Sequence, residues 1–205
     1  MIDRHLELLV EEPSMEAFLR VLLPRQLPID CTFEVHPFQG KIDLLQKLRG
    51  RLRGYAQWLP DNWRIVVVVD RDDDDCEELK QQLEKIATSA GLRSRTNAGV
   101  IPWQLVNRIA IEELEAWYFG DWQAVCEAFP RVKSSILTKA SYRDPDAIMG
   151  GTWEAFERVL QRYRYFKSGL RKIEAARAIG ARLEPSRNQS RSFVRFHEAI
   201  VESVA

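Results

Sequence analysis

The stretch "IVVVVDRDDDDC" at residues 65–76 constrains this chain more than any other feature, because five consecutive aliphatic residues run directly into a cluster of acids. A run that is apolar on both faces is typical of a central parallel strand covered by helices on both sides. The five carboxyl groups at 70–75 repel one another and raise each other's pKa unless a cation or backbone N–H groups compensate. The stretch therefore predicts a buried strand that ends at a bound cation or at acids splayed into water.

Strand and helix patterns alternate around this stretch. The apolar run at 5–10 and the alternation at 31–38 indicate strands, whereas apolar residues recur at helical spacing over 41–59 and 76–90. Ser14 is the expected N-cap of a helix that follows the first strand. Repeated strand–helix units of this kind predict an α/β fold with an open, mostly parallel sheet flanked by helices.

The second half of the chain has a different character. A short strand is expected at 107–111, running straight into a helix, and from about residue 130 the pattern is helical and basic. We therefore expect two parts. A catalytic α/β domain would occupy residues 1–130, and a helical, basic extension over 131–205 would pack on it.

The net charge is zero, from 30 basic and 30 acidic residues, but the charges are unevenly distributed. The segment 158–195 holds eleven basic residues against two acids, which gives it a charge of +9 and leaves −9 for the rest. Aromatic side chains are interleaved with these arginines, a combination that suits contact with phosphates and stacking on bases. The alternative is a solvated helical face. The expected nucleic-acid-binding residues, one of them outside this segment, are Lys41, Arg171, Lys172, Arg187 and Arg191.

The acids are expected to form a metal site. In open α/β sheets, functional groups collect beyond the carboxyl ends of the strands. Asp70 follows the aliphatic run, and Glu11 and Glu12 follow the first apolar run, so both groups can meet at one edge. Carboxylate oxygens are the ligands that Mg²⁺ prefers, and Mn²⁺ accepts the same set. The candidate ligands are Glu11, Asp70, Asp72, Asp74 and, for a second ion, Glu112, with Glu113 as its alternative.

Helix capping is the competing explanation for several of these acids. Asp75 is placed to be the N-cap of the helix that starts at residue 76, with Glu78 at the third helical position, and Asp73 can belong to the same turn. The acids of "IEELEAW" at 111–117 stand at a helix start, where the helix dipole alone favours them. Capping explains Asp70 least well, because it follows the aliphatic run directly.

Composition excludes several other kinds of site. The three cysteines are far apart and odd in number, and the three histidines are scattered, so neither a disulfide framework nor a zinc site is expected. No apolar run approaches the ~18 residues of a membrane span, and the N-terminus lacks the profile of a signal peptide. We therefore expect a cytoplasmic protein that does not associate with membranes.

Two stretches resemble a known family of nucleic-acid enzymes. "LLVEEPSMEAFL" followed by "VVVVDRDDDD" resembles the TOPRIM pattern, in which a glutamate after the first strand joins an Asp-x-Asp after a later strand to hold Mg²⁺. The stretches "FQGKIDLL", "DRDDDDC", "RIAIEELEAW" and "NQSRSF" are similar to a bacterial TOPRIM-like family known as domain of unknown function 4276. This resemblance implies a Rossmann-like fold.

The same resemblance implies roles for individual residues. Glu11 would be the acid/base or metal-linked glutamate, and Asp70 and Asp72 would be metal ligands. Many TOPRIM proteins have glycine directly after the glutamate, whereas this chain has Glu12, so either Glu11 or Glu12 can be the glutamate of the site.

The leading hypothesis is a Mg²⁺-dependent TOPRIM-like nuclease that hydrolyses phosphodiester bonds in DNA or RNA. Resemblance to nucleases of the OLD (overcoming lysogenization defect) type implies a separate ATPase partner and a role in phage defence, since this chain carries no ATPase motif. One alternative is a non-catalytic TOPRIM scaffold that binds nucleic acid or the ATPase. Another is a haloacid-dehalogenase-like phosphatase, although that family has Thr or Val where this chain has Asp74.

Overall fold

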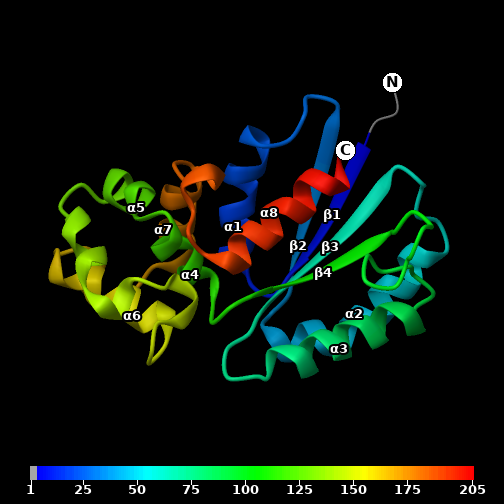
Figure 1. Cartoon of the computed structure of the whole chain (residues 1–205), viewed down its shortest axis with the longest axis horizontal. Helices are drawn as coiled ribbons and strands as arrows, with labels where there is room; N and C mark the ends of the chain where they lie inside the picture. The colour runs from blue at the N-terminus through cyan, green and yellow to red at the C-terminus, as the bar shows by residue number, and fades with distance from the viewer. Residues whose placement is uncertain (1–3) are drawn as a thin grey trace.

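The computed structural model describes residues 4–205 and contains a four-stranded parallel sheet in the order β2-β1-β3-β4 (Figure 1). The expected α/β class with a parallel sheet and flanking helices is confirmed. No helix within 4–205 is long and apolar enough to cross a membrane. The strands are β1 (Arg4–Val10), β2 (Cys31–Pro37), β3 (Trp63–Asp70) and β4 (Leu105–Ala110).

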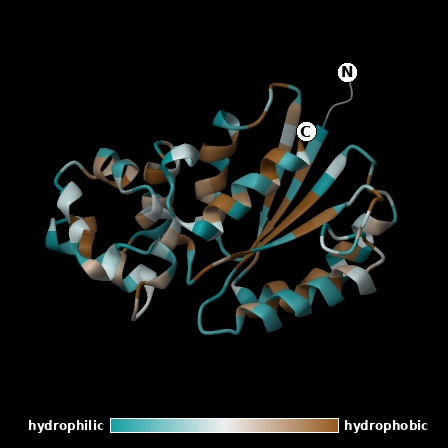
Figure 2. Cartoon of the chain, in the orientation of Figure 1, coloured by the Kyte–Doolittle hydropathy of each residue, from teal (hydrophilic) through white to brown (hydrophobic). Residues whose placement is uncertain are grey.

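Helices cover both faces of the sheet. On one face α2 (Lys41–Ala56) and α3 (Cys76–Ser89) pack on the strands, and on the other face lie α1 (Pro13–Leu22) and α8 (Arg191–Ser203) (Figure 1). The aliphatic side chains at 65–69 alternate between these two cores and are fully buried. This double coverage explains why β3 is apolar on both faces, and Figure 2 shows hydrophobic residues along the middle of the strands.

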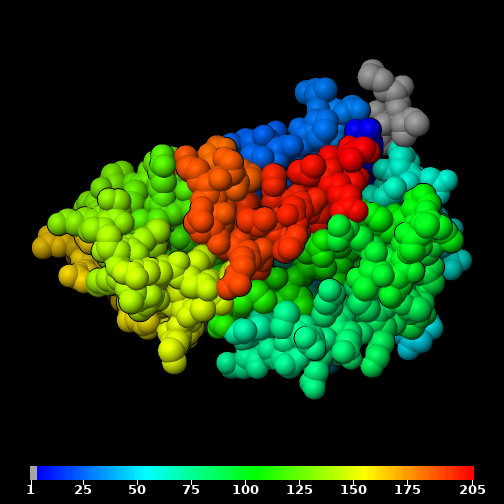
Figure 3. Space-filling model, viewed as in Figure 1, coloured from blue at the N-terminus to red at the C-terminus, as the bar shows by residue number. Residues whose placement is uncertain are grey.

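A lobe of helices lies beyond the carboxyl ends of the strands (Figure 1). It contains four α-helices and several short 3-10 turns, and it shares one apolar core with α1, α8 and a face of the sheet. The chain then returns through α8 to β4, and Figure 3 shows this C-terminal segment lying across the surface of the molecule between the lobe and the sheet. The α-helices of the lobe are α4 (Leu114–Gly120), α5 (Trp122–Ala128), α6 (Thr152–Arg162) and α7 (Lys172–Gly180). The 3-10 turns of the chain are Leu23–Arg25, Ser134–Thr138, Ala140–Tyr142, Pro145–Ala147 and Pro185–Arg187.

Some element boundaries differ from those expected. The N-cap of α1 is Glu12 rather than Ser14, because Pro13 occupies the first helical position, where its missing N–H costs nothing. β4 begins two residues before the expected strand, at Leu105. The helix that follows is broken at Asp121, which caps α5 by accepting a hydrogen bond from the backbone N of Ala124.

Candidate functional site

The carboxyl ends of β1 and β3 meet at the middle of the sheet. From β1 the chain passes to α1 on one face, whereas from β3 it passes to α3 on the opposite face. Neighbouring parallel strands whose connections leave to opposite faces open a crevice beyond their carboxyl ends, and ligands of such sheets bind there. Glu11 directly follows β1 and Asp70 ends β3, so the fold places both acids at this crevice.

Asp70 and Glu11 are in direct contact. The backbone N–H of Asp70 donates a hydrogen bond to Glu11 Oε2 at 3.1 Å. Asp70 is only 5% exposed, and its Oδ1 has no hydrogen-bond partner among the described residues. Burial, followed by repulsion from Glu11 and Glu12, raises the pKa of Asp70 well above its usual value. Burial likewise raises the pKa of Glu11 to about 7, against the opposing effect of the hydrogen bond from Asp70.

Asp72 lies at the outer side of this pair. Its backbone is in the left-handed region, with φ of 49°, and its N–H donates to the carbonyl of Glu112 at 2.9 Å. The ammonium of Lys41 lies 2.8 Å from Asp72 Oδ2 and 2.7 Å from Asp74 Oδ2, and it also donates to the carbonyl of Arg71 at 2.9 Å. The acidic run is therefore partly neutralised by a cation of the chain itself.

A pocket opens beside these outer acids. Its volume is about 440 Å³, and it lies between the start of α2 and the loop after β3. Burial lowers the pKa of Lys41 in this setting, but its hydrogen bonds with Asp72 and Asp74 outweigh burial and raise the pKa overall. The residues that line the pocket are Glu11, Gln39, Gly40, Lys41, Ile42, Asp72, Asp73 and Asp74.

A second group of charges lies on the inner side, toward the helical lobe. Glu115 of α4 is 1% exposed, and its Oε2 has no hydrogen-bond partner within residues 4–205. Burial raises the pKa of Glu115 to about 8, with Lys172 acting in the opposite direction. The Nζ of Lys172 lies 3.6 Å from Glu12 Oε1. Glu12 therefore faces the lobe, whereas Glu11 faces Asp70, and this difference favours Glu11 as the glutamate of the crevice.

Glu115 and the inward position of Lys172 were not expected from the sequence. In the sequence the helix dipole alone accounts for Glu115, and the basic segment predicts Lys172 as a contact to nucleic acid. One signal in the sequence does point to burial of Glu115, because it is a single acid within the otherwise apolar stretch "LEAWYFG" of α4. An ionisable residue in a fully buried helix needs a partner or a raised pKa.

The other glutamates near β4 are engaged elsewhere. Glu112, the candidate ligand for a second ion, forms an ion pair with Arg71, and its φ of 61° is also left-handed. Glu113 Oε2 accepts hydrogen bonds from Thr152 Oγ1 at 3.0 Å and from the backbone N of Trp153 at 2.9 Å. Glu113 thus holds the start of α6, which is a structural task.

Capping of α3 follows the sequence expectation. Asp75 is the N-cap, and its Oδ1 accepts hydrogen bonds from the backbone N–H groups of Glu77 and Glu78, each at 2.9 Å. Asp75 is therefore turned toward its own helix. The five acids of the run accordingly divide into the helix cap Asp75, the two partners of Lys41, the exposed Asp73 that lines the pocket, and the buried Asp70.

The carboxyl groups gathered at the crevice suit a hard divalent ion by their chemistry, because each offers oxygen ligands. Within residues 4–205, however, no three His, Cys, Asp or Glu side chains are arranged so that they could hold a metal ion together. Asp72 is turned toward Lys41, and one oxygen of Glu11 is turned toward the backbone of Asp70. The unpartnered Oδ1 of Asp70 is the observation that fits a cation at this place.

The basic residues of the second half fall into two groups. Arg187 donates to both carboxylate oxygens of Asp121, whose side chain is 1% exposed, so it is part of the packing of the lobe. Arg171 and Arg191 are exposed, and their partners, Glu174 and Asp144, lie on the surface. Of the residues expected to bind nucleic acid, Arg171 and Arg191 therefore remain accessible to a phosphate backbone.

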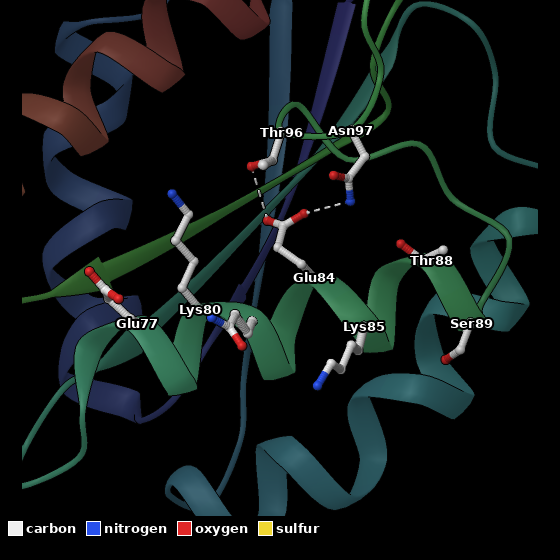
Figure 4. A pocket seen from close by; sticks show the side chains of 9 residues that line it. Glu77, Lys80, Glu84, Lys85, Thr88, Ser89, Thr96 and Asn97 are labelled. Atoms are coloured by element: carbon white, nitrogen blue, oxygen red, sulfur yellow. Dashed lines mark hydrogen bonds between the residues drawn. The ribbon is translucent and has the colours of Figure 1, made fainter.

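A wider concavity, of about 730 Å³, lies along α3 and has a different origin (Figure 4). Glu84 accepts hydrogen bonds from Thr96 Oγ1 at 3.3 Å and from Asn97 Nδ2 at 3.4 Å, so it ties the loop before β4 to α3. Lys85 and Ser89 point away from this group in Figure 4. Because the lining side chains diverge and several are already occupied with the loop, we regard this concavity as a consequence of loop packing.

Comparison with known proteins gives one match. The model of a family described as Domain of unknown function (DUF4276) matches residues 10–201, which is most of the chain and includes the whole crevice. No curated protein matches the chain, and no solved structure matches it.

Proposed function

We propose that this chain, which belongs to the family described as Domain of unknown function (DUF4276), is a Mg²⁺-dependent, TOPRIM-like nuclease that hydrolyses phosphodiester bonds in DNA or RNA. The observation that carries the proposal is the buried Oδ1 of Asp70, which has no partner among the described residues and lies beside Glu11 at the crevice of the sheet. Buried polar atoms without a partner are rare, and a bound cation is one of the ways in which such a carboxylate oxygen is satisfied.

Glu11, Asp70 and Asp72 would hold the ion, after a side-chain movement of Asp72 away from Lys41. When bound, Mg²⁺ would polarise the scissile phosphate and lower the pKa of a water molecule. Glu11 lines the pocket, and it would accept the proton of the attacking water. Attack of the water oxygen on phosphorus would break the bond to one ester oxygen, which would leave with a proton taken from a second water molecule. Arg171 and Arg191 would hold the backbone of the nucleic acid.

The resemblance to OLD-type nucleases supports two broader proposals. A separate ATPase would act with this chain and control access to the crevice, and the pair would serve in defence against phage. These proposals rest on the resemblance alone. They are tested by asking whether the product of a neighbouring ATPase gene binds the chain and changes its cleavage rate.

Cleavage itself is tested with plasmid, single-stranded DNA and RNA in the presence of Mg²⁺ or Mn²⁺. We expect Asp70→Asn to abolish cleavage, while its stability in metal-free buffer stays equal or rises, because asparagine removes the cost of burying or protonating a carboxylate beside other acids. The matched control is Asp75→Asn, which removes one charge from the same acidic run but keeps a good helix cap. It should cut like the parent. Cleavage by Asp70→Asn at the parental rate would disprove the metal-nuclease proposal.

A second candidate function has an observation of its own. Lys41 already compensates two of the acids without a metal, which is what a scaffold that has lost catalysis would need. In that case the chain would bind nucleic acid or its ATPase partner but cut nothing under any divalent ion, with or without the partner. The two functions are separated by the same cleavage assay, combined with a binding measurement on the uncut substrate.

A further inference from the structure

Lys41 occupies a central place in the acidic crevice. It is the first residue of α2, and its side chain is only 14% exposed. Its ammonium lies within 2.9 Å of three oxygens, which belong to Asp72, Asp74 and the carbonyl of Arg71. Three oxygen atoms around one small cation resemble part of a metal coordination sphere. The ammonium therefore stands where the outer ligands of a divalent ion would be needed.

The backbone holds Lys41 and Asp72 in this arrangement. Gly40 has φ of 92° and donates its N–H to the carbonyl of Glu11 at 3.0 Å, so α2 begins against the end of β1. Such a φ favours glycine, because it has no Cβ. Asp72 also has a left-handed backbone, which is uncommon for a residue other than glycine. These two turns bring the start of α2 and the loop after β3 together.

Lys41 neutralises Asp72 and Asp74, but it does not supply a partner for Asp70. Asp70 Oδ1 remains buried and without a partner among the described residues, and Glu11 is turned toward the backbone of Asp70. Lys41 contacts Oδ2 of Asp72, so a divalent ion that binds Asp70 and Asp72 together would share one carboxylate with Lys41 or displace it. A divalent ion and the ammonium of Lys41 on the same carboxylate would also repel each other. Lys41 and the ion are therefore expected to exclude one another from Asp72.

We propose that Lys41 is an internal counter-ion that competes with the divalent ion for Asp72 and, once displaced, turns its ammonium into the adjacent pocket to contact a phosphate of the substrate. The pocket of about 440 Å³ between α2 and the acidic loop gives the side chain this second position. The exchange couples metal loading to substrate binding. It rests on the proposed function, because it assumes that a divalent ion binds at Asp70 and Asp72.

The test is a binding isotherm for MnCl₂ alone, measured by calorimetry on the full chain without nucleic acid. Lys41→Gln removes the competing charge and should increase the affinity for Mn²⁺ by about tenfold. Lys41→Arg keeps the charge and should stay close to the parent. The matched control is Lys47→Gln, because Lys47 lies on the same helix and pairs with Asp43, outside the crevice. It should also bind like the parent.

Thermal unfolding shows whether a change in Mn²⁺ affinity comes from a folding defect of the variant. In buffer with a chelator, Lys41→Gln should unfold at a lower temperature than the parent, because the acids lose their counter-ion. Added Mn²⁺ should raise the unfolding temperature of Lys41→Gln by more than it raises that of the parent. An equal response of the two proteins to Mn²⁺ would count against the competition.

The isotherms separate failure of this inference from failure of the proposed function. Equal or weaker Mn²⁺ binding by Lys41→Gln overturns the competition while the metal site itself stands. Absence of Mn²⁺ binding in the parent and in all variants overturns both the competition and the metal site. Tighter binding by Lys41→Gln, with Lys41→Arg and Lys47→Gln unchanged, supports the exchange.

Discussion

A carboxyl group that is buried without a partner must stay protonated or obtain a cation. Asp70 and Glu115 both carry such an oxygen, and repulsion from Glu12 adds to burial in raising the pKa of each. Lys172 opposes this effect at Glu115 and reaches Glu12 from α7. At the scale of single residues, the crevice is thus a place where burial and repulsion act together on several acids.

Glu115 gives a prediction about pH. Its pKa in the folded chain, about 8, is above its ordinary value of 4.5, so folding favours the protonated form. This contribution to stability is complete below pH 4.5 and is lost as the pH rises toward 8. Glu115→Gln cannot ionise, so between pH 5 and 8 its free energy of unfolding should fall less steeply than that of the parent, by up to about 1.4 kcal/mol per pH unit.

The measurement is urea unfolding at several pH values. The charged groups that face Glu115 are Lys172, Glu113 and Glu12, and all three remain in the variant. Glu127→Gln is the control, because Glu127 is exposed on α5 and its carboxylate accepts a hydrogen bond from Gln123 of the same helix. Parallel curves for the parent and Glu115→Gln would show that Glu115 keeps its charge in the folded chain.

At the scale of elements, several charged residues of the crevice lie at the first positions of helices. α2 begins at Lys41 after the left-handed Gly40, α3 begins after the cap Asp75, and α7 begins at Lys172. Both lysines of the crevice are therefore first residues of helices that start at its rim. The N-cap residues of α2 and α7 make no side-chain capping hydrogen bond, so of these three helix starts only that of α3 is held by a side-chain cap.

Asp75→Ala tests the cap of α3. The variant loses two hydrogen bonds to the start of α3, so we expect its free energy of unfolding to drop by about 1 kcal/mol. Asp75→Asn should retain most of the stability, because asparagine also caps well. If Asp75 serves only as a cap, both variants keep the nuclease activity. Loss of activity in Asp75→Asn would instead show that the charge of Asp75 contributes to the site.

At the scale of the whole molecule, the sheet and the helical lobe share one apolar core, and α8 returns from the lobe to β4. The basic residues of the second half are distributed over this assembly in different roles. Arg187 is bound to the buried Asp121, whereas Arg171 is exposed and lies 5.0 Å from the ring centre of Phe166. A positive segment in the sequence therefore contains both packing residues and surface residues.

Two arginine variants separate these roles. Arg187→Met leaves the carboxylate of Asp121 buried without its cation and should lower the free energy of unfolding by about 2 kcal/mol, less than for a fully buried pair because Arg187 is partly exposed. Arg171→Ala should leave stability within about 0.5 kcal/mol. If Arg171 contacts duplex DNA, its loss should flatten the log–log salt dependence of binding by about 0.9.

Urea unfolding and binding titrations over a range of salt concentrations provide both readings. Arg182→Ala is a suitable surface control, because Arg182 is exposed just after α7 and its guanidinium donates to the backbone carbonyl of Ala178 in that helix. A salt dependence that is the same for the parent and Arg171→Ala would remove Arg171 from the nucleic-acid surface. An unchanged stability of Arg187→Met would show that Asp121 finds other partners.

Local sequence determined the parallel strand at 65–69, the cap at Asp75 and the presence of acids at a strand end, because periodicity, capping and burial of aliphatic residues act over short stretches of chain. The class of fold followed from repeating these units. Only the tertiary structure decided that Lys41 neutralises Asp72 and that Lys172 turns inward to Glu12. These partners are far apart in the chain. A local sequence pattern does not predict which distant charges become neighbours when the strands and helices pack together.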